Sequence, residues 1–152
     1  MQGYVDKVGA LVEKARHIRH SESLSCVIIS GGELYRFSRR GVKDLYTIYS
    51  EQPSLLKGAT IADKVVGRGA AVIMVAGGIR ELYAEVISRP AEALLKSHGV
   101  AVGYGALVDN IINRTGDDIC PVERLCMECA SVAEALPRIA DFIASQATAT
   151  KE

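Results

Sequence analysis

The stretch from Glu81 to Gly105 constrains the fold more than any other part of the sequence. It consists of the β-type run ELYAEVIS, the helix-type run PAEALLKSHG and a second β-type run, VAVGYG. Pro90 suits the first turn of a helix, and Gly99 suits its end. A helix between two strands is typical of a crossover that joins parallel strands of one sheet. We therefore expect a parallel pair of strands with a helix packed on the sheet.

The rest of the chain predicts further elements on both sides of this unit. Apolar side chains at spacings of three and four indicate helices, and β-branched runs indicate strands. Gly31-Gly32 favours a hairpin, because both residues of such a turn need positive φ. Before the unit, the expected elements are a helix over 4–17, hairpin strands over 24–30 and 33–39, and a helix from 41 to 52. A short extended segment from 59 then leads into a buried helix that begins at Ala62. After the unit, residues 106–118 are ambiguous, and a short helix after Cys120 and a last helix over 131–146 follow.

These elements predict an α/β protein with one domain. The order favours a three-layer α/β/α sandwich with a mixed sheet, which begins with an antiparallel pair and continues through parallel crossovers. A chain of 152 residues has the size of one domain, and no repeat, linker or low-complexity segment divides it. We expect a single domain over residues 1–146 and a disordered tail over 147–152.

The composition of the chain indicates which classes of partner it can bind. Because 18 basic residues balance 18 acidic ones, the chain lacks the positive charge with which proteins bind nucleic acids. The longest apolar run, 70–76, is too short to span a membrane. The first 20 residues carry several charges and lack an apolar core of the length found in signal peptides. We expect a cytoplasmic protein without nucleic-acid or membrane partners. With 49% hydrophobic residues, it is expected to form a homo-oligomer.

Two short stretches fit the frame of a zinc-dependent deaminase without its ligands. The order hairpin, helix, strand, helix, strand resembles the cytidine-deaminase-like fold, in which His-x-Glu and Pro-Cys-x-x-Cys lie at the starts of consecutive helices. If Ala62 takes the His position, Lys64 takes the Glu position. Pro90 is followed by Ala91, and Leu94 stands at the second cysteine position. Since every zinc ligand is replaced, we expect no metal and no cofactor.

A closer resemblance rests on several longer stretches. The segments GVKDL, LLKGATIADKVVGRGAA, YAEVIS, HGVAVGYG and INRTGDDICPVE are together similar to an uncharacterised prokaryotic family in the cytidine-deaminase-like superfamily. The similarity runs from about Leu24 to Glu123. It implies a zinc-free, cytidine-deaminase-like fold and no established activity.

The first expected function is the binding of a small nucleotide-like ligand. In such a fold, helix N-termini converge on a pocket at the edge of the sheet. The segment NRTGDD, residues 113–118, is rich in Gly and Asx residues and suits a loop that carries polar groups over a pocket. The candidate ligand-binding residues are Asn113, Arg114, Thr115, Asp117 and Ser88.

The alternative is a zinc-independent enzyme. Cys120 precedes Pro121 at a helix start, where the helix dipole stabilises a thiolate nucleophile. Lys64 could stabilise charge, while Asp63 or Glu123 moves protons. A purely structural interpretation also stays open, in which Asp63 and Glu123 cap helices and Cys120 packs. A second alternative is a homodimeric interaction module.

The remaining cysteines and histidines favour structural interpretations. Cys126 and Cys129 follow Cys120 as a Cys-x-x-Cys pair, which is half of a metal site, but their helical spacing favours packing in the core. His17 and His20 fall at the end of the first helix, where a positive charge favours the helix dipole. We therefore interpret both histidines as helix-end residues.

Overall fold

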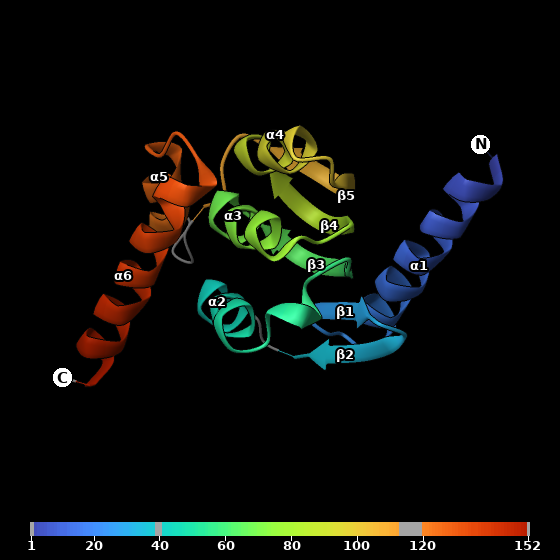
Figure 1. The fold of residues 1–152 in the computed structure, drawn as a ribbon, viewed down its shortest axis with the longest axis horizontal. Helices are drawn as coiled ribbons and strands as arrows, with labels where there is room; N and C mark the ends of the chain where they lie inside the picture. The colour runs from blue at the N-terminus through green and yellow to red at the C-terminus, as the bar shows by residue number, and fades with distance from the viewer. Residues whose placement is uncertain (1, 39–40, 113–119, 152) are drawn as a thin grey trace.

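A computed structural model describes residues 2–38, 41–112 and 120–151, with side chains described between residues 10 and 145. Within these ranges the chain forms one five-stranded sheet with helices on both faces (Figure 1). The helices are α1 (Gln2–Ser21), α2 (Val42–Glu51), α3 (Arg68–Gly77), α4 (Arg89–Ser97), α5 (Pro121–Met127) and α6 (Val132–Lys151), with a 3-10 helix η1 (Pro53–Leu55). The strands are β1 (Cys26–Ser30), β2 (Glu33–Phe37), β3 (Thr60–Val66), β4 (Glu81–Ser88) and β5 (Ala101–Val108).

The sheet is mixed, as the sequence predicts. Its strand order is β2-β1-β3-β4-β5. Strand β1 pairs antiparallel with both β2 and β3, whereas β3, β4 and β5 are parallel and are joined through α3 and α4. The turn between β1 and β2 has φ angles of 57° at Gly31 and 82° at Gly32, so the predicted hairpin is confirmed. The α/β class is confirmed with it.

The helices divide between the two faces of the sheet. Helix α1 packs against β1, β3 and β4 on one face. Helices α2, α3 and α4 lie on the other face, and α5 and α6 pack against α3 (Figure 1). The main core fills the space between the sheet and these helices, with Ile28, Ile61 and Leu82 from strands and Ile73 and Leu95 from helices. The starts of α3 and α4 therefore lie on a firmly packed support.

The predicted start of the buried helix at Ala62 is wrong. Residues 60–66 form β3, and α3 begins at Arg68 after the N-cap Gly67. Strand β3 pairs with β1 on one side and with β4 on the other, so its backbone donors and acceptors are satisfied as a central strand. Ala62 and Val66 are fully buried in that position. The segment thus gains more from sheet pairing than from a longer helix.

Helices α1 and α6 each contain 20 residues. Among the described residues, no helix combines the length and the apolar character that a membrane span requires. The backbone of α6 is helical to Lys151, and thus through part of the segment expected to be a tail. The domain limits 1–146 and the disordered tail 147–152 stay predictions.

Candidate functional site

A cavity of about 280 Å³ lies where three helices begin. The N-cap residues of α2, α3 and α5, which are Gly41, Gly67 and Cys120, all line it. Its apolar walls come from Val42, Val65, Ala70, Ile111 and Val122. Glu123 adds a carboxylate. The cavity therefore combines apolar walls with the polar beginnings of helices.

The carboxylate of Glu123 holds this corner of the fold together. Its side chain is buried, with the residue 1% exposed. Oε1 accepts hydrogen bonds from the Arg68 amide, at 2.8 Å, and from the Ser88 hydroxyl, at 2.6 Å. Oε2 accepts one from the Ile111 amide. Ser88 is also the N-cap of α4 and accepts a hydrogen bond from the Ala91 amide at 3.3 Å. One carboxylate thus links the starts of α3 and α4.

Two glycines allow α5 to approach α3 this closely. A Cβ on Gly67 would lie 3.1 Å from Ile111 Cγ1 and 3.3 Å from Glu123 Oε1. A Cβ on Gly69 would overlap the side chain of Val122. The absence of side chains at both positions lets Glu123 reach the first turn of α3.

Two of the four candidate catalytic residues lie together in this cavity. Cys120 is half-buried at the N-cap of α5 and lines the cavity with Glu123. Lys64 is exposed on β3, and neither it nor Asp63 is among the residues that line the cavity. Asp63 is buried and accepts a hydrogen bond from the Lys64 amide at 2.8 Å. The expected helix start at Asp63 and Lys64 is therefore replaced by a strand.

Of the five candidate ligand-binding residues, the structure describes Ser88 alone. Ser88 is fully buried and donates its hydroxyl hydrogen to Glu123. Asn113, Arg114, Thr115 and Asp117 lie outside the described residues. Ser88 therefore acts on the site through Glu123, while the role of the other four stays a prediction.

Cys126 and Cys129 belong to the main core, together with Cys26. Burial raises the pKa of the Cys126 thiol from 9.0 to about 12, with a further increase from neighbouring Cys129, while the positive charge of Arg68 opposes the shift. Within the described ranges, no group of three or more His, Cys, Asp or Glu side chains is placed to hold a metal ion. The geometry of Cys126 and Cys129 favours packing.

The protein is expected to lose stability in alkali through Cys126. Its folded-state pKa lies above the unfolded value, so the contribution is complete below pH 9.0 and is lost as the pH rises towards about 12. Each pH unit in this window costs about 1.4 kcal/mol. Urea unfolding across the window should give a flatter profile for Cys126→Ala than for the wild type. Parallel profiles would contradict this expectation.

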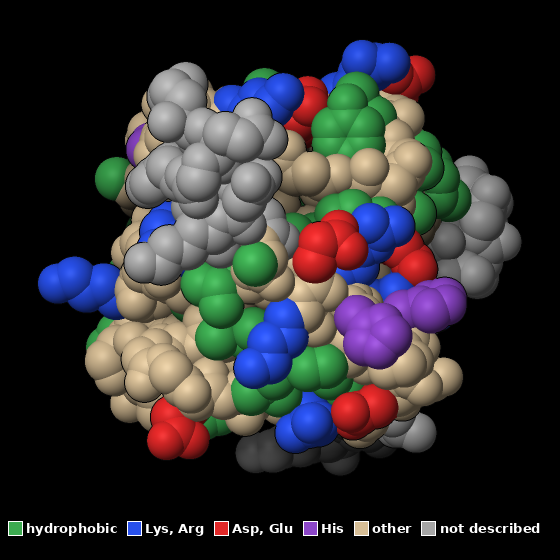
Figure 2. All heavy atoms as spheres, turned by 90° about the vertical axis from the view of Figure 1, so that its right-hand side faces the viewer, with side chains coloured by type: hydrophobic (Ala, Val, Ile, Leu, Met, Phe, Trp, Pro, Cys, Tyr) green, Lys and Arg blue, Asp and Glu red, His purple; other side chains and the backbone are tan. Residues whose placement is uncertain are grey.

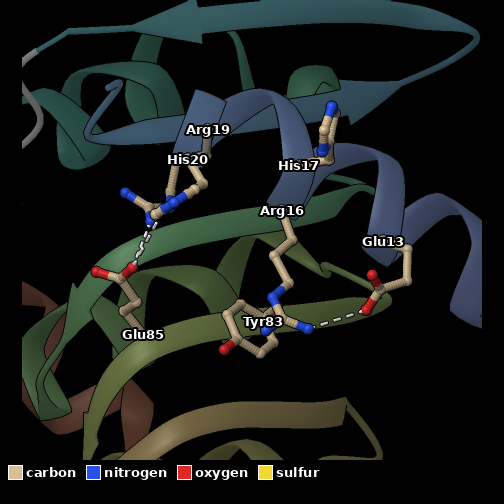
Figure 3. A pocket seen from close by; sticks show the side chains of 7 residues that line it. All are labelled: Glu13, Arg16, His17, Arg19, His20, Tyr83 and Glu85. Atoms are coloured by element: carbon tan, nitrogen blue, oxygen red, sulfur yellow. Dashed lines mark hydrogen bonds and ion pairs between the residues drawn. The ribbon is translucent and has the colours of Figure 1, made fainter. Parts of the chain in front are cut away.

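A second cavity, of about 390 Å³, lies between α1 and β4 on the other face of the sheet (Figure 3). Glu13, Arg16, His17, Arg19 and His20 line it from α1, and Tyr83 and Glu85 line it from β4. The interpretation of His17 and His20 as helix-end residues missed this cavity. The run RHIRH at 16–20 was the available signal, because it places four basic side chains within five residues.

Comparisons with known proteins give a family and a fold. Residues 14–143 match the family described as TM1506, domain of unknown function (DUF1893). The crystal structure of a DUF1893 family protein (TM1506) from Thermotoga maritima is similar, with a TM-score of 0.78 and 25% sequence identity, over 87% of this chain and 89% of that one. No curated protein matches the chain. The match covers most of the sequence, and the chain therefore belongs to the DUF1893 family, whose function is unknown.

Proposed function

We propose that the protein binds a small nucleotide-like ligand in the cavity at the N-termini of α2, α3 and α5. The observation that carries this function is the presence of three N-caps around one cavity. The first amides of a helix lack acceptors within the helix, and the helix dipole makes this end positive. Helices α2 and α3, with 10 residues each, are long enough to favour a phosphate or carbonyl oxygen here.

The size and walls of the cavity indicate a compact ligand. A volume of about 280 Å³ lies just below the roughly 300–1,000 Å³ that small-molecule sites occupy. Val42, Val65 and Val122 line the cavity and suit a flat, apolar body. The charge of Glu123 is directed to three donors of the protein. A nucleobase, a nucleoside or a small nucleotide meets these conditions better than a dinucleotide.

The fold that we propose is a zinc-free variant of the cytidine-deaminase-like fold. In the fold that the sequence resembles, metal ligands come from the starts of two consecutive helices. Here those starts carry Gly67 and Arg68 in one helix and Pro90 and Ala91 in the next. Both helix starts are instead hydrogen-bonded to the carboxylate of Glu123, one through the Arg68 amide and the other through the Ser88 hydroxyl. This arrangement supports a site that binds ligands without the metal hydroxide of a deaminase.

A blocked cavity tests ligand binding. The position of a Cβ on Gly41 has no atom within 4 Å, so Gly41→Phe can place its ring in the cavity without a clash at Cβ. We expect calorimetric titration with the four nucleosides to detect binding to the wild type and none to Gly41→Phe. Gly103→Ala, in β5, serves as the control and should bind as the wild type does. If no nucleoside binds, or if Gly41→Phe still binds a nucleoside, the cavity is not the site.

A second candidate function is thiol catalysis by Cys120. It is favoured by the position of Cys120 in the same cavity as a carboxylate that could move protons, Glu123. Lys64, the candidate charge stabiliser, is exposed on β3. Catalysis by Cys120 also requires that its thiol be accessible to a substrate.

Iodoacetamide labelling is expected to single out Cys120 in the folded protein. Cys120 is half-buried, while Cys26, Cys126 and Cys129 are buried, and burial blocks the access of the reagent. Peptide mapping over time should show Cys120 modified first. We expect Lys64→Ala to leave the rate unchanged, since Lys64 does not line the cavity. An unreactive Cys120 would remove the enzymatic candidate.

We also propose that two copies associate through β5. This strand forms an edge of the sheet, and its eight residues, AVGYGALV, carry no charge. The opposite edge strand, β2, contains Glu33 and Arg36. Uncharged edge strands are prone to pair with another strand. Light scattering should show a dimer that Ala106→Lys converts to the monomer mass of 16.3 kDa, whereas a monomeric wild type would exclude association.

A further inference from the structure

We propose that the cavity between α1 and β4 is a second binding site, which takes a small soluble molecule with a tetrahedral oxyanion such as a phosphate monoester. Protonation of His17 and His20 strengthens this binding. The site lies on the α1 face of the sheet, away from the cavity at the helix N-termini. Figure 2 shows histidine side chains gathered on this face beside basic and acidic ones.

Fixed side chains form the base of the cavity. The side chain of Arg19 is 5% exposed and is held at both ends of its guanidinium. Nη1 donates to the Leu24 carbonyl at 2.9 Å, and Nη2 donates to Glu85 Oε1 at 2.7 Å. The guanidinium of Arg16 lies 4.5 Å from the centre of the Tyr83 ring. A base that is already ordered reduces the entropy that a ligand loses on binding.

The net charge of the cavity depends on the protonation of its histidines, because its other charged side chains form ion pairs. Arg16 pairs with Glu13 at 3.1 Å, and Arg19 pairs with Glu85 at 2.7 Å. These two positive and two negative side chains cancel. The cavity is therefore neutral when His17 and His20 are neutral, and it becomes positive when they gain protons. An anion therefore binds more tightly in the second state.

His20 lies beside an acidic side chain at the end of a helix. It belongs to the last turn of α1. Its Nδ1 is 4.0 Å from Glu85 Oε1. Histidine changes charge between about pH 5 and 8, and protonated imidazoles form strong, charge-assisted hydrogen bonds to oxyanions. The charged and titratable groups that line the cavity with the two histidines are Glu13, Arg16 and Arg19 on α1, and Tyr83 and Glu85 on β4.

Arg16 is the group that can contact the ligand directly. Its side chain is 47% exposed, whereas Arg19 is buried. Figure 3 shows that Arg16 reaches from α1 over Tyr83. A guanidinium presents several donors in a planar fork that matches the oxygens of a phosphate. The volume of about 390 Å³ suits a small metabolite and excludes a polymer.

Sulfate titration at two pH values tests the site. Sulfate is the probe because it keeps two negative charges over this range, whereas inorganic phosphate changes its own charge. We expect calorimetry to show roughly tenfold tighter binding at about pH 6 than at about pH 8, the range in which histidine titrates. The double variant His17→Gln/His20→Gln should lose this pH dependence. His98→Gln, at the end of α4, is the matched control and should retain it.

Further variants separate this site from the other proposed functions. Arg16→Gln should weaken sulfate binding at both pH values, and Lys14→Gln, an exposed residue of the same helix, should not. Gly41→Phe should bind sulfate as the wild type does. Glycerol 3-phosphate should compete with sulfate. The site is overturned if sulfate does not bind, if the double variant keeps the pH dependence, or if only vesicles containing phosphatidic acid compete.

Discussion

Glu123→Ala is expected to destabilise the protein by about 3 kcal/mol or more, because a buried donor that loses its acceptor costs about 1–3 kcal/mol. The change removes the acceptor of the Arg68 amide, the Ser88 hydroxyl and the Ile111 amide together. It also leaves a cavity beside Gly67. Urea unfolding followed by circular dichroism gives the free energy of unfolding.

Two further variants bracket the effect of Glu123. Glu123→Gln keeps one oxygen that accepts hydrogen bonds, so it should destabilise the protein less than Glu123→Ala does. Its NH2 group would nevertheless meet a hydrogen-bond donor of the protein. Glu128→Ala is the control, since Glu128 is exposed at the end of the same short helix. We expect a change of less than about 0.5 kcal/mol there. If Glu123→Ala were as mild as Glu128→Ala, the hydrogen bonds to Glu123 would not support the fold.

Gly69→Ala is expected to destabilise the protein by about 1–3 kcal/mol, the usual cost of an overpacked core. Its Cβ would overlap the Val122 side chain, so α5 would have to move away from α3. Helix propensity alone would favour alanine by about 1 kcal/mol. A loss of stability on thermal or urea unfolding would show that helix packing outweighs propensity.

A double variant separates the clash from other effects. Val122→Ala removes the side chain that Gly69→Ala would meet, so the double variant should be more stable than the sum of the two single changes predicts. Gly103→Ala is the control, because its Cβ would be 3.6 Å from Tyr83, an ordinary contact. Strictly additive changes at Gly69 and Val122 would contradict the predicted overlap.

Local signals were sufficient for several elements of the fold. The run from Glu81 to Ser88 forms β4 with the predicted bounds, and the helix with Pro90 in its first turn follows directly. The two glycines between β1 and β2 adopt positive φ as predicted. In each case the residues that define the element are neighbours in sequence, and the physical cause acts within a few residues.

The start of α3 could not be located in this way. Residues 60–66 contain the charged pair Asp63-Lys64, which is typical of a helix start, and a long apolar run follows. The same residues become a central strand only because β1 and β4 lie on either side. This pairing depends on segments that are distant in sequence, so tertiary contacts override the local preference.

The candidate sites show the same limit. Cys120 was recognised because Pro121 follows it, but the hydrogen bonds of Glu123 connect residues 35 and 55 positions apart. The cavity beside α1 likewise depends on contacts from Arg16 to Tyr83 and from Arg19 to Glu85, two residues of β4. Patterns of residue type indicate which side chains carry chemistry. They do not indicate which of these side chains meet.

The linkage of α3 and α4 through Glu123 also bears on how the chain folds during its synthesis. Strands β3 and β4 and helices α3 and α4 leave the ribosome well before α5. Until Glu123 follows, the Arg68 amide and the Ser88 hydroxyl lack their acceptor, and the face of α3 that α5 and α6 cover stays open. A nascent chain stalled before α5 therefore holds an unfinished core, which is a surface that chaperones recognise.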